Sequence, residues 1–195
     1  MARKGKDPEA LRSAITDAAE QIIIQEGFRA CSARAVTGKA GCALGSLGYL
    51  FGGLDNVILE VNARTLLEMG NFMFAEAEKM SGSTSKKLEA LALGYFRYAR
   101  DHLNRWEALF ALRWAAQEAL PSDYLALRGN LLDRIATLFA EDMPLTVPER
   151  SVLARTMYEA VHGIVVLGLD RRLGGSHEDV EGRIRLLVGK MLIQI

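Results

Sequence analysis

Apolar residues recur at helical spacing along most of this chain, and that pattern constrains it to an all-α fold. Leu11, Ile15 and Ile22 fall on one helical face, and Asp7 and Pro8 before them suit a helix start. The β-branched alternation that indicates strands is almost absent. We therefore predict about nine helices.

Glycine, proline and short polar stretches divide the pattern into segments. We expect a first helix that ends at Gly27, a second that is capped by Ser32 and runs through Lys39, and a short third helix over residues 44–50. The later helices are expected over residues 54–80, 85–103, 105–119, 122–142, 148–173 and 177–194. We predict two domains, at residues 1–53 and 54–195.

Composition excludes several classes of protein. Half of the 195 residues are hydrophobic, which is enough for a core, and 24 basic residues balance 24 acidic ones, so any nucleic-acid site must be local. The N-terminus lacks the apolar region of a signal peptide, and the apolar run Gly163–Leu169 is far shorter than a membrane span, which indicates a cytoplasmic protein without a membrane partner. Three dispersed histidines, without a catalytic or phosphate-binding motif, argue against an enzyme, a metal site or a cofactor.

The segment AGCALGSLGYLF, residues 40–51, places three glycines around the start of the third expected helix. Two short helices with a glycine corner have the geometry of a helix-turn-helix, whose second helix enters the major groove of DNA. Gly41 suits the corner, and Gly45 leaves room for close approach to a phosphate or base edge.

Residues 27–59 resemble the DNA-binding segment of TetR-type transcriptional regulators. In that pattern a glycine and an aromatic residue close helix one, a Ser or Thr caps helix two, and a Gly-Thr-Leu-Tyr-Tyr-x-Phe run forms the recognition helix. The matching residues are Gly27, Phe28, Ser32, Arg34, Ala40, Gly41, Gly45, Leu47, Tyr49 and Phe51, with Ser46 in place of the Thr. The later helices fit the family's effector-binding and dimerisation domain. Tyr158, His162 and Gly163 resemble the motif of its Trp-His-Gly subgroup.

The resemblance implies a set of DNA contacts. Backbone and hydroxyl donors at helix starts, with basic and phenolic side chains, would hold phosphates, while Leu44 and Ser46 would face base edges and Leu47 and Phe51 would be core. The predicted DNA-binding residues are Ser32, Arg34, Lys39, Leu44, Gly45, Ser46, Gly48, Tyr49 and Leu50.

Three departures from the family pattern leave an alternative open. Gly48 replaces the first of two tyrosines, Leu54 replaces a phosphate-binding Lys, and Ala43 replaces a Ser cap. The chain could therefore be a helical dimer with weakened or lost operator binding. A basic N-terminal arm of Arg3, Lys4, Lys6 and Arg12 could compensate, or could be a solvated tail.

The resemblance also implies a pocket for a small, hydrophobic or aromatic effector, although most such side chains are core in other proteins. Arg113 could anchor an anionic group or extend its charge to solvent, and His162 could be a core histidine bonded to a neighbour. The candidate pocket residues are Met69, Phe72, Met73, Tyr95, Phe96, Trp106, Phe110, Arg113, Trp114 and His162.

The last two expected helices suit a homodimer interface, because one is apolar nearly all round and the other carries an apolar stripe. The candidate interface residues are Met157, Val161, Val165, Ile184, Leu187, Val188 and Met191. The expected function is that of a dimeric repressor that an effector releases from a double-stranded DNA operator, although some such regulators activate. A thiol or redox sensor that uses Cys31 and Cys42 is a further alternative.

Overall fold

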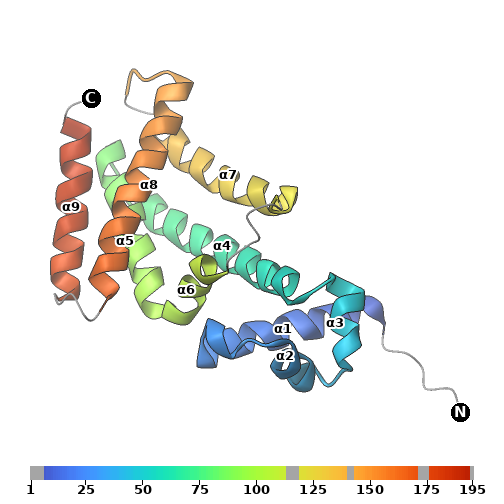
Figure 1. The fold of residues 1–195 in the computed structure, drawn as a ribbon. Helices are drawn as coiled ribbons and strands as arrows, with labels where there is room; N and C mark the ends of the chain where they lie inside the picture. Colours follow the sequence, from blue (N-terminus) through green and yellow to red (C-terminus); the bar gives the residue numbers. More distant parts are fainter. Residues whose placement is uncertain (1–6, 113–118, 140–142, 171–175, 194–195) are drawn as a thin grey trace, which may run out of the picture. The chain divides into compact units, whose positions relative to one another are not determined.

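The computed structural model describes residues 7–112, 119–139, 143–170 and 176–193, and within these ranges it contains helices and no strand (Figure 1). The all-α prediction is therefore confirmed. The elements are α1 Pro8–Glu26, the 3-10 turn η1 Phe28–Ala30, α2 Ala33–Ala40, α3 Leu44–Phe51, α4 Leu54–Glu78, α5 Thr84–Asp101, α6 Leu103–Ala111, α7 Ser122–Leu138, α8 Val147–Leu169 and α9 His177–Ile193.

The ends of the helices follow the chemistry of their capping residues. The Asp7 carboxylate accepts a hydrogen bond from the Glu9 backbone amide at 3.3 Å, and Pro8 occupies the first turn of α1. Gly27 ends α1 with a φ of 83°, which a residue with a side chain rarely adopts. The Thr146 amide before α8 donates to the Glu149 carboxylate at 2.7 Å, which is half of a capping box.

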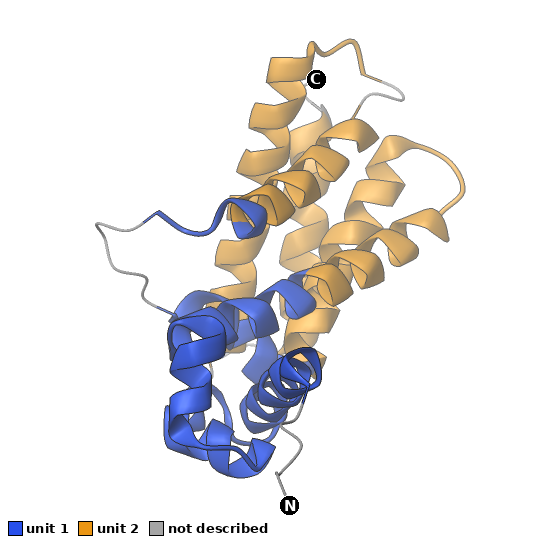
Figure 2. Ribbon diagram, turned by 90° about the vertical axis from the view of Figure 1, so that its right-hand side faces the viewer, with its two compact units in different colours: residues 1–66, 102–124 blue, residues 67–101, 125–195 orange. Residues whose placement is uncertain are grey.

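The helices form two compact units, shown in separate colours in Figure 2. Unit 1 contains residues 1–66 and 102–124, and unit 2 contains residues 67–101 and 125–195. These units differ from a simple division after residue 53, because the first part of α4 and all of α6 pack with α1. The division into functional domains at residues 1–53 and 54–195 stays a prediction.

Unit 1 encloses one apolar core beneath its short helices. Side chains from α1, α2, α3 and α4 meet there, and Ala108 of α6 completes the core with no exposed surface. Two side-chain amides link α6 to α4 and α1. Asn62 of α4 donates to the Ala108 carbonyl at 3.2 Å, and Asn104 of α6 donates to the Ile24 carbonyl at 2.9 Å. Helix α6 is therefore part of the unit that carries the helix-turn-helix.

Unit 2 is built around α5, which packs against both α8 and α9. Leu88, Leu91 and Tyr95 lie on the inner side of α5 and are buried. Helices α8 and α9 approach closely at Gly168, where an added Cβ would lie 2.5 Å from a Val180 methyl carbon. A larger residue at this position would force the two helices apart.

Among the described helices, α8 alone is long and apolar enough to cross a membrane by length and composition. Such a single helix is weak evidence for a membrane protein, and α8 also carries Glu149, Arg150, Arg155 and Glu159. Only part of α8 is buried within the chain, and apolar side chains such as Val152 and Val166 remain exposed on its outer side.

Candidate nucleic-acid interface

Helices α2 and α3 form a helix-turn-helix whose corner is set by two residues. Ser32 precedes α2, and its hydroxyl accepts a hydrogen bond from the Ala35 amide at 3.3 Å, as predicted for a cap. Gly41 follows α2 in the left-handed conformation, with φ 64° and ψ 43°, and the next amide, of Cys42, donates to the Thr37 carbonyl at 3.0 Å. The corner therefore depends on a glycine at residue 41.

Helix α3 has a buried face and an exposed face. Leu47 and Phe51 are 4% and 7% exposed, which confirms that both belong to the core. Leu44 is 52% exposed and Tyr49 is 85% exposed on the outer face. A large aromatic side chain exposed to this extent gains little from the fold, so its position favours contact with a partner.

The glycines of α3 lie on open surface. A Cβ added at Gly45 or Gly48 would meet no atom within 4 Å. Neither residue has the positive φ that distinguishes Gly41, so the fold of the described residues gives no internal reason for glycine there.

The structure brings the predicted DNA-binding residues to the surface of one helix-turn-helix. Seven are exposed, namely Ser32, Arg34, Lys39, Leu44, Gly45, Gly48 and Tyr49, while Ser46 and Leu50 are partly buried. Leu50 packs against the core of unit 1, so its side chain is less available to DNA than the sequence suggests.

The C-terminal end of α3 is fixed by α1 and α4. The Arg12 guanidinium donates to the Leu50 carbonyl at 2.7 Å, lies 4.2 Å from the centre of the Phe51 ring and pairs with the Glu60 carboxylate. The assignment of Arg12 to a DNA-binding arm is corrected by these contacts, since its side chain is engaged within unit 1. Arg3, Lys4 and Lys6 lie outside the described residues.

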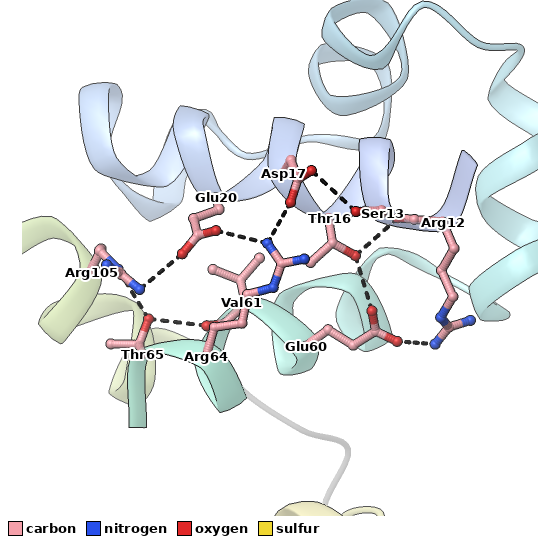
Figure 3. Close-up of polar contacts among 10 residues, drawn as sticks. All are labelled: Arg12, Ser13, Thr16, Asp17, Glu20, Glu60, Val61, Arg64, Thr65 and Arg105. Atoms are coloured by element: carbon pink, nitrogen blue, oxygen red, sulfur yellow. Dashed lines mark hydrogen bonds and ion pairs between the residues drawn. The ribbon is translucent and has the colours of Figure 1, made fainter. Parts of the chain in front are cut away.

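Figure 3 shows the Arg12–Glu60 pair next to a second network of charged residues between α1, α4 and α6. Arg64 pairs with Asp17 at 2.6 Å and with Glu20 at 2.9 Å. Glu20 also binds Arg105 of α6 at 2.9 Å, and Arg105 is only 8% exposed. A charge this deeply buried requires its partner, so the network fixes α6 on the helix-turn-helix unit. Helical periodicity gave no signal for these pairs, because they join residues up to 85 positions apart.

Comparison with known proteins identifies the family to which this chain belongs. The model of the Tetracyclin repressor-like, C-terminal domain matches residues 88–191, which is more than half of the chain. The chain belongs to the TetR family. The matched region lies outside the helix-turn-helix, so the two parts of the chain support the same family through separate observations: the model match for the C-terminal part and the residue pattern for the N-terminal part.

Several solved structures share this fold. A protein of unknown function from Rhodococcus sp. RHA1 is 17% identical, with 95% of each chain covered and a TM-score of 0.76. A TetR transcriptional regulator from Rhodococcus sp. RHA1 is 16% identical, with 96% of this chain and 98% of that chain covered and a TM-score of 0.67. The multidrug binding protein EbrR, complexed with imidazole, is 20% identical, with 92% and 93% covered and a TM-score of 0.64. No curated protein matches the sequence.

TetR-family proteins are regulators, and the predicted absence of enzymatic activity follows from the family.

The candidate effector residues are divided between the two compact units. Met69, Met73, Tyr95 and Phe96 are buried in unit 2, which also contains the partly exposed Phe72 and the half-buried His162. Trp106 is buried in unit 1 and contacts the exposed Phe110 edge to face, with ring centres 5.3 Å apart. Arg113 and Trp114 lie outside the described residues.

Three of the aromatic residues in unit 2 form a cluster, which we call the Tyr95 cluster: Tyr95, Tyr158 and His162. The Tyr95 hydroxyl lies 2.7 Å from His162 Nδ1, and the rings of Tyr158 and His162 are stacked with centres 5.8 Å apart. Burial raises the pKa of Tyr158 and lowers the pKa of His162, so both side chains favour their uncharged forms. The bonded histidine foreseen from the sequence is present, whereas Tyr158 was identified only as part of a family motif.

The predicted dimer-interface residues require a correction. Met157, Val161, Val165, Ile184 and Val188 are at most 4% exposed within a single chain, so they belong to the core of unit 2 and offer no surface to a partner. Leu187 and Met191 are only partly exposed. The apolar stripe recognised over the last expected helix is the inner face of α9, and the buried candidates on α8 lie on the inner face of that helix.

The two cysteines give little support for a thiol sensor. Cys31 is 7% exposed, and its burial raises the pKa of the thiol to about 11. Reactive cysteines instead have a lowered pKa and an accessible sulfur. Cys42 is half-buried.

Proposed function

We propose that this TetR-family protein binds a double-stranded DNA operator as a homodimer, represses transcription there, and is released by a small hydrophobic or aromatic effector. The observation that carries the proposal is the outer face of the helix-turn-helix, where Tyr49 is 85% exposed and two glycines leave the backbone accessible. A surface of this kind suits close approach to DNA.

The first test is a mobility shift of the purified protein with the DNA upstream of its own gene, against a random duplex at a stated salt concentration. Specific retention is the expected result. Tyr49→Ala should weaken binding about tenfold, as for loss of one hydrogen bond to a charged phosphate, and should leave the helical circular dichroism unchanged. Equal retention of both duplexes by a folded protein would favour the alternative of lost operator binding.

The homodimer is supported by the outer faces of α8 and α9, not by the residues named from the sequence. On α8, Val152, Val166 and Leu167 are 66%, 41% and 53% exposed, and a Cβ at Gly163 would meet no atom within 4 Å. Leu186 of α9 is 62% exposed. Apolar surface on long helices, with a glycine that allows close approach, suits a helix-helix interface.

Light scattering tests this interface. We expect a dimer at micromolar concentration and a monomer for Val166→Glu, because an unpaired carboxylate would be buried between the chains. Leu125→Glu, at an exposed leucine of α7, is the matched control and should stay dimeric. A monomeric wild-type protein would overturn the proposed homodimer.

The effector class is proposed from the Tyr95 cluster. Its side chains are aromatic and favour uncharged forms, which suits a neutral aromatic or apolar compound better than an ion. EbrR, which has a similar fold, is a multidrug binding protein. A thermal-shift screen of aromatic compounds should find ligands that raise the Tm and weaken retention of DNA. Ligands that raise the Tm without any change in DNA retention would contradict release by an effector.

A further inference from the structure

We propose that α3 distinguishes operator sequences through thymine methyl groups and the shape of the duplex, and that it forms no base-specific bidentate hydrogen bond to guanine. This inference rests on the proposed binding of DNA by α3. It concerns which operator sequences the protein selects, and it assigns Leu44 as the residue that determines that selection.

The composition of α3 limits the contacts that its side chains can make with bases. The helix LGSLGYLF contains no Arg, Lys, Asn, Gln, Asp or Glu. Bidentate reading of guanine requires Arg or Lys, reading of adenine requires Asn or Gln, and reading of cytosine uses Asp or Glu. The side chains of α3 therefore cannot make any of these pairings.

Burial limits which side chains of α3 are available to contact the bases. Leu47 and Phe51 are buried in the core of unit 1, and the partly buried side chain of Leu50 packs against that core. Leu44, 52% exposed in the first turn, is the one large apolar side chain that α3 presents at its N-terminal end. Apolar contact with the C5 methyl group of thymine is the base-specific interaction open to such a side chain.

The glycines support a close approach of this end. Gly45 and Gly48 both face open space, although glycine weakens a helix interior. Without their side chains the backbone of α3 can lie near the base edges, which brings Leu44 within reach of a methyl group. The partly buried Ser46 hydroxyl accepts or donates to any base and so selects weakly.

The exposed cations among the predicted DNA-binding residues lie on α2, not on α3. Arg34 and Lys39 lie exposed on α2, and in the proposed complex they contact phosphates, which sets the orientation of the protein without selecting a sequence. Selectivity beyond methyl contacts would then come from the sequence-dependent shape and deformability of the DNA.

The test begins with selection of bound duplexes from a random library by the full-length protein. We expect enriched half-sites with thymines at the positions that α3 covers. Replacing those thymines by deoxyuridine, which lacks the methyl group, should weaken binding about fourfold per methyl group, the factor equivalent to burial of one such group. Deoxyuridine placed outside the half-sites is the control and should have no effect.

The protein side of the test separates a contact from a structural role. Leu44→Ala should bind thymine and deoxyuridine duplexes equally, whereas Leu44→Met should keep the preference for thymine. An enriched half-site whose binding falls more than tenfold when guanine is replaced by 7-deazaguanine would overturn the inference alone. Failure to enrich any sequence would overturn the proposed DNA binding as well.

Discussion

The guanidinium of Arg12 on α1 donates a 2.7 Å hydrogen bond to the backbone carbonyl of Leu50 in the last turn of α3. The same group pairs with Glu60 of α4, whose carboxylate also accepts a hydrogen bond from Thr16 at 3.0 Å. A carbonyl at the end of a helix has no partner within its own helix, so this contact satisfies it and fixes the direction of α3.

Arg12→Ala should lower the free energy of unfolding by about 1 kcal/mol, because it removes a charge-assisted hydrogen bond in a partly exposed position. We also expect weaker operator binding with an unchanged dependence on salt, since Arg12 positions α3 and does not itself neutralise a phosphate. Urea unfolding and mobility shifts at several salt concentrations measure both effects. Arg29→Ala, at an exposed arginine of η1, is the control for stability. A reduced salt slope for Arg12→Ala would instead indicate a direct phosphate contact.

Two glycine substitutions in the helix-turn-helix should act in opposite directions. Gly48→Ala should stabilise the protein by up to about 1 kcal/mol, because the position is helical and its Cβ would meet no atom. Gly41→Ala should destabilise it by about 1 kcal/mol or more, because φ is 64° there. Thermal unfolding compares the two variants directly. If Gly48 is kept for close approach to DNA, Gly48→Ala should bind the operator more weakly in spite of its greater stability.

The Tyr95 cluster should make stability depend on pH. Burial lowers the pKa of His162 below its ordinary value, so the folded protein binds this proton less readily than the unfolded chain. The unfolding free energy should therefore fall as the pH decreases below about 6.5, the ordinary pKa of histidine. Above that pH, His162 is neutral in both the folded and the unfolded chain, and its protonation causes no loss of stability. Subtracting the same titration for His162→Gln isolates this residue. A loss of stability between pH 7.5 and 5.5 that is equal in both proteins would contradict the prediction.

Cys31 should be unreactive in the folded protein. A pKa of about 11 leaves on the order of one thiol in several thousand ionised at pH 7.5, and the residue is buried. We expect about one equivalent of fast reaction with a thiol reagent, at the half-buried Cys42, and a second only after unfolding. Cys42→Ser should abolish the fast phase. Loss of DNA binding under mild oxidation that Cys31→Ser prevents would restore the redox alternative.

Local rules explain why much of this protein follows from its sequence. The cap at Ser32, the left-handed Gly41, and the buried Leu47 and Phe51 depend on residue type and on neighbours within a few positions, and all are as predicted. Helical period also identified the apolar stripe of α9. A period shows that a face is apolar, but the same stripe can bury against its own chain or against a partner.

That choice was made only by the tertiary structure. The packing of α5, α8 and α9 buries Met157, Val161 and Val165 inside the chain and leaves Val166 and Leu186 outside, which reverses the predicted interface. The ion pairs of Arg12 and Arg105 likewise join distant helices, and charge at a single position does not indicate its partner. Local propensity therefore determined the helices and the corner at Gly41, whereas long-range packing decided which faces are free to bind.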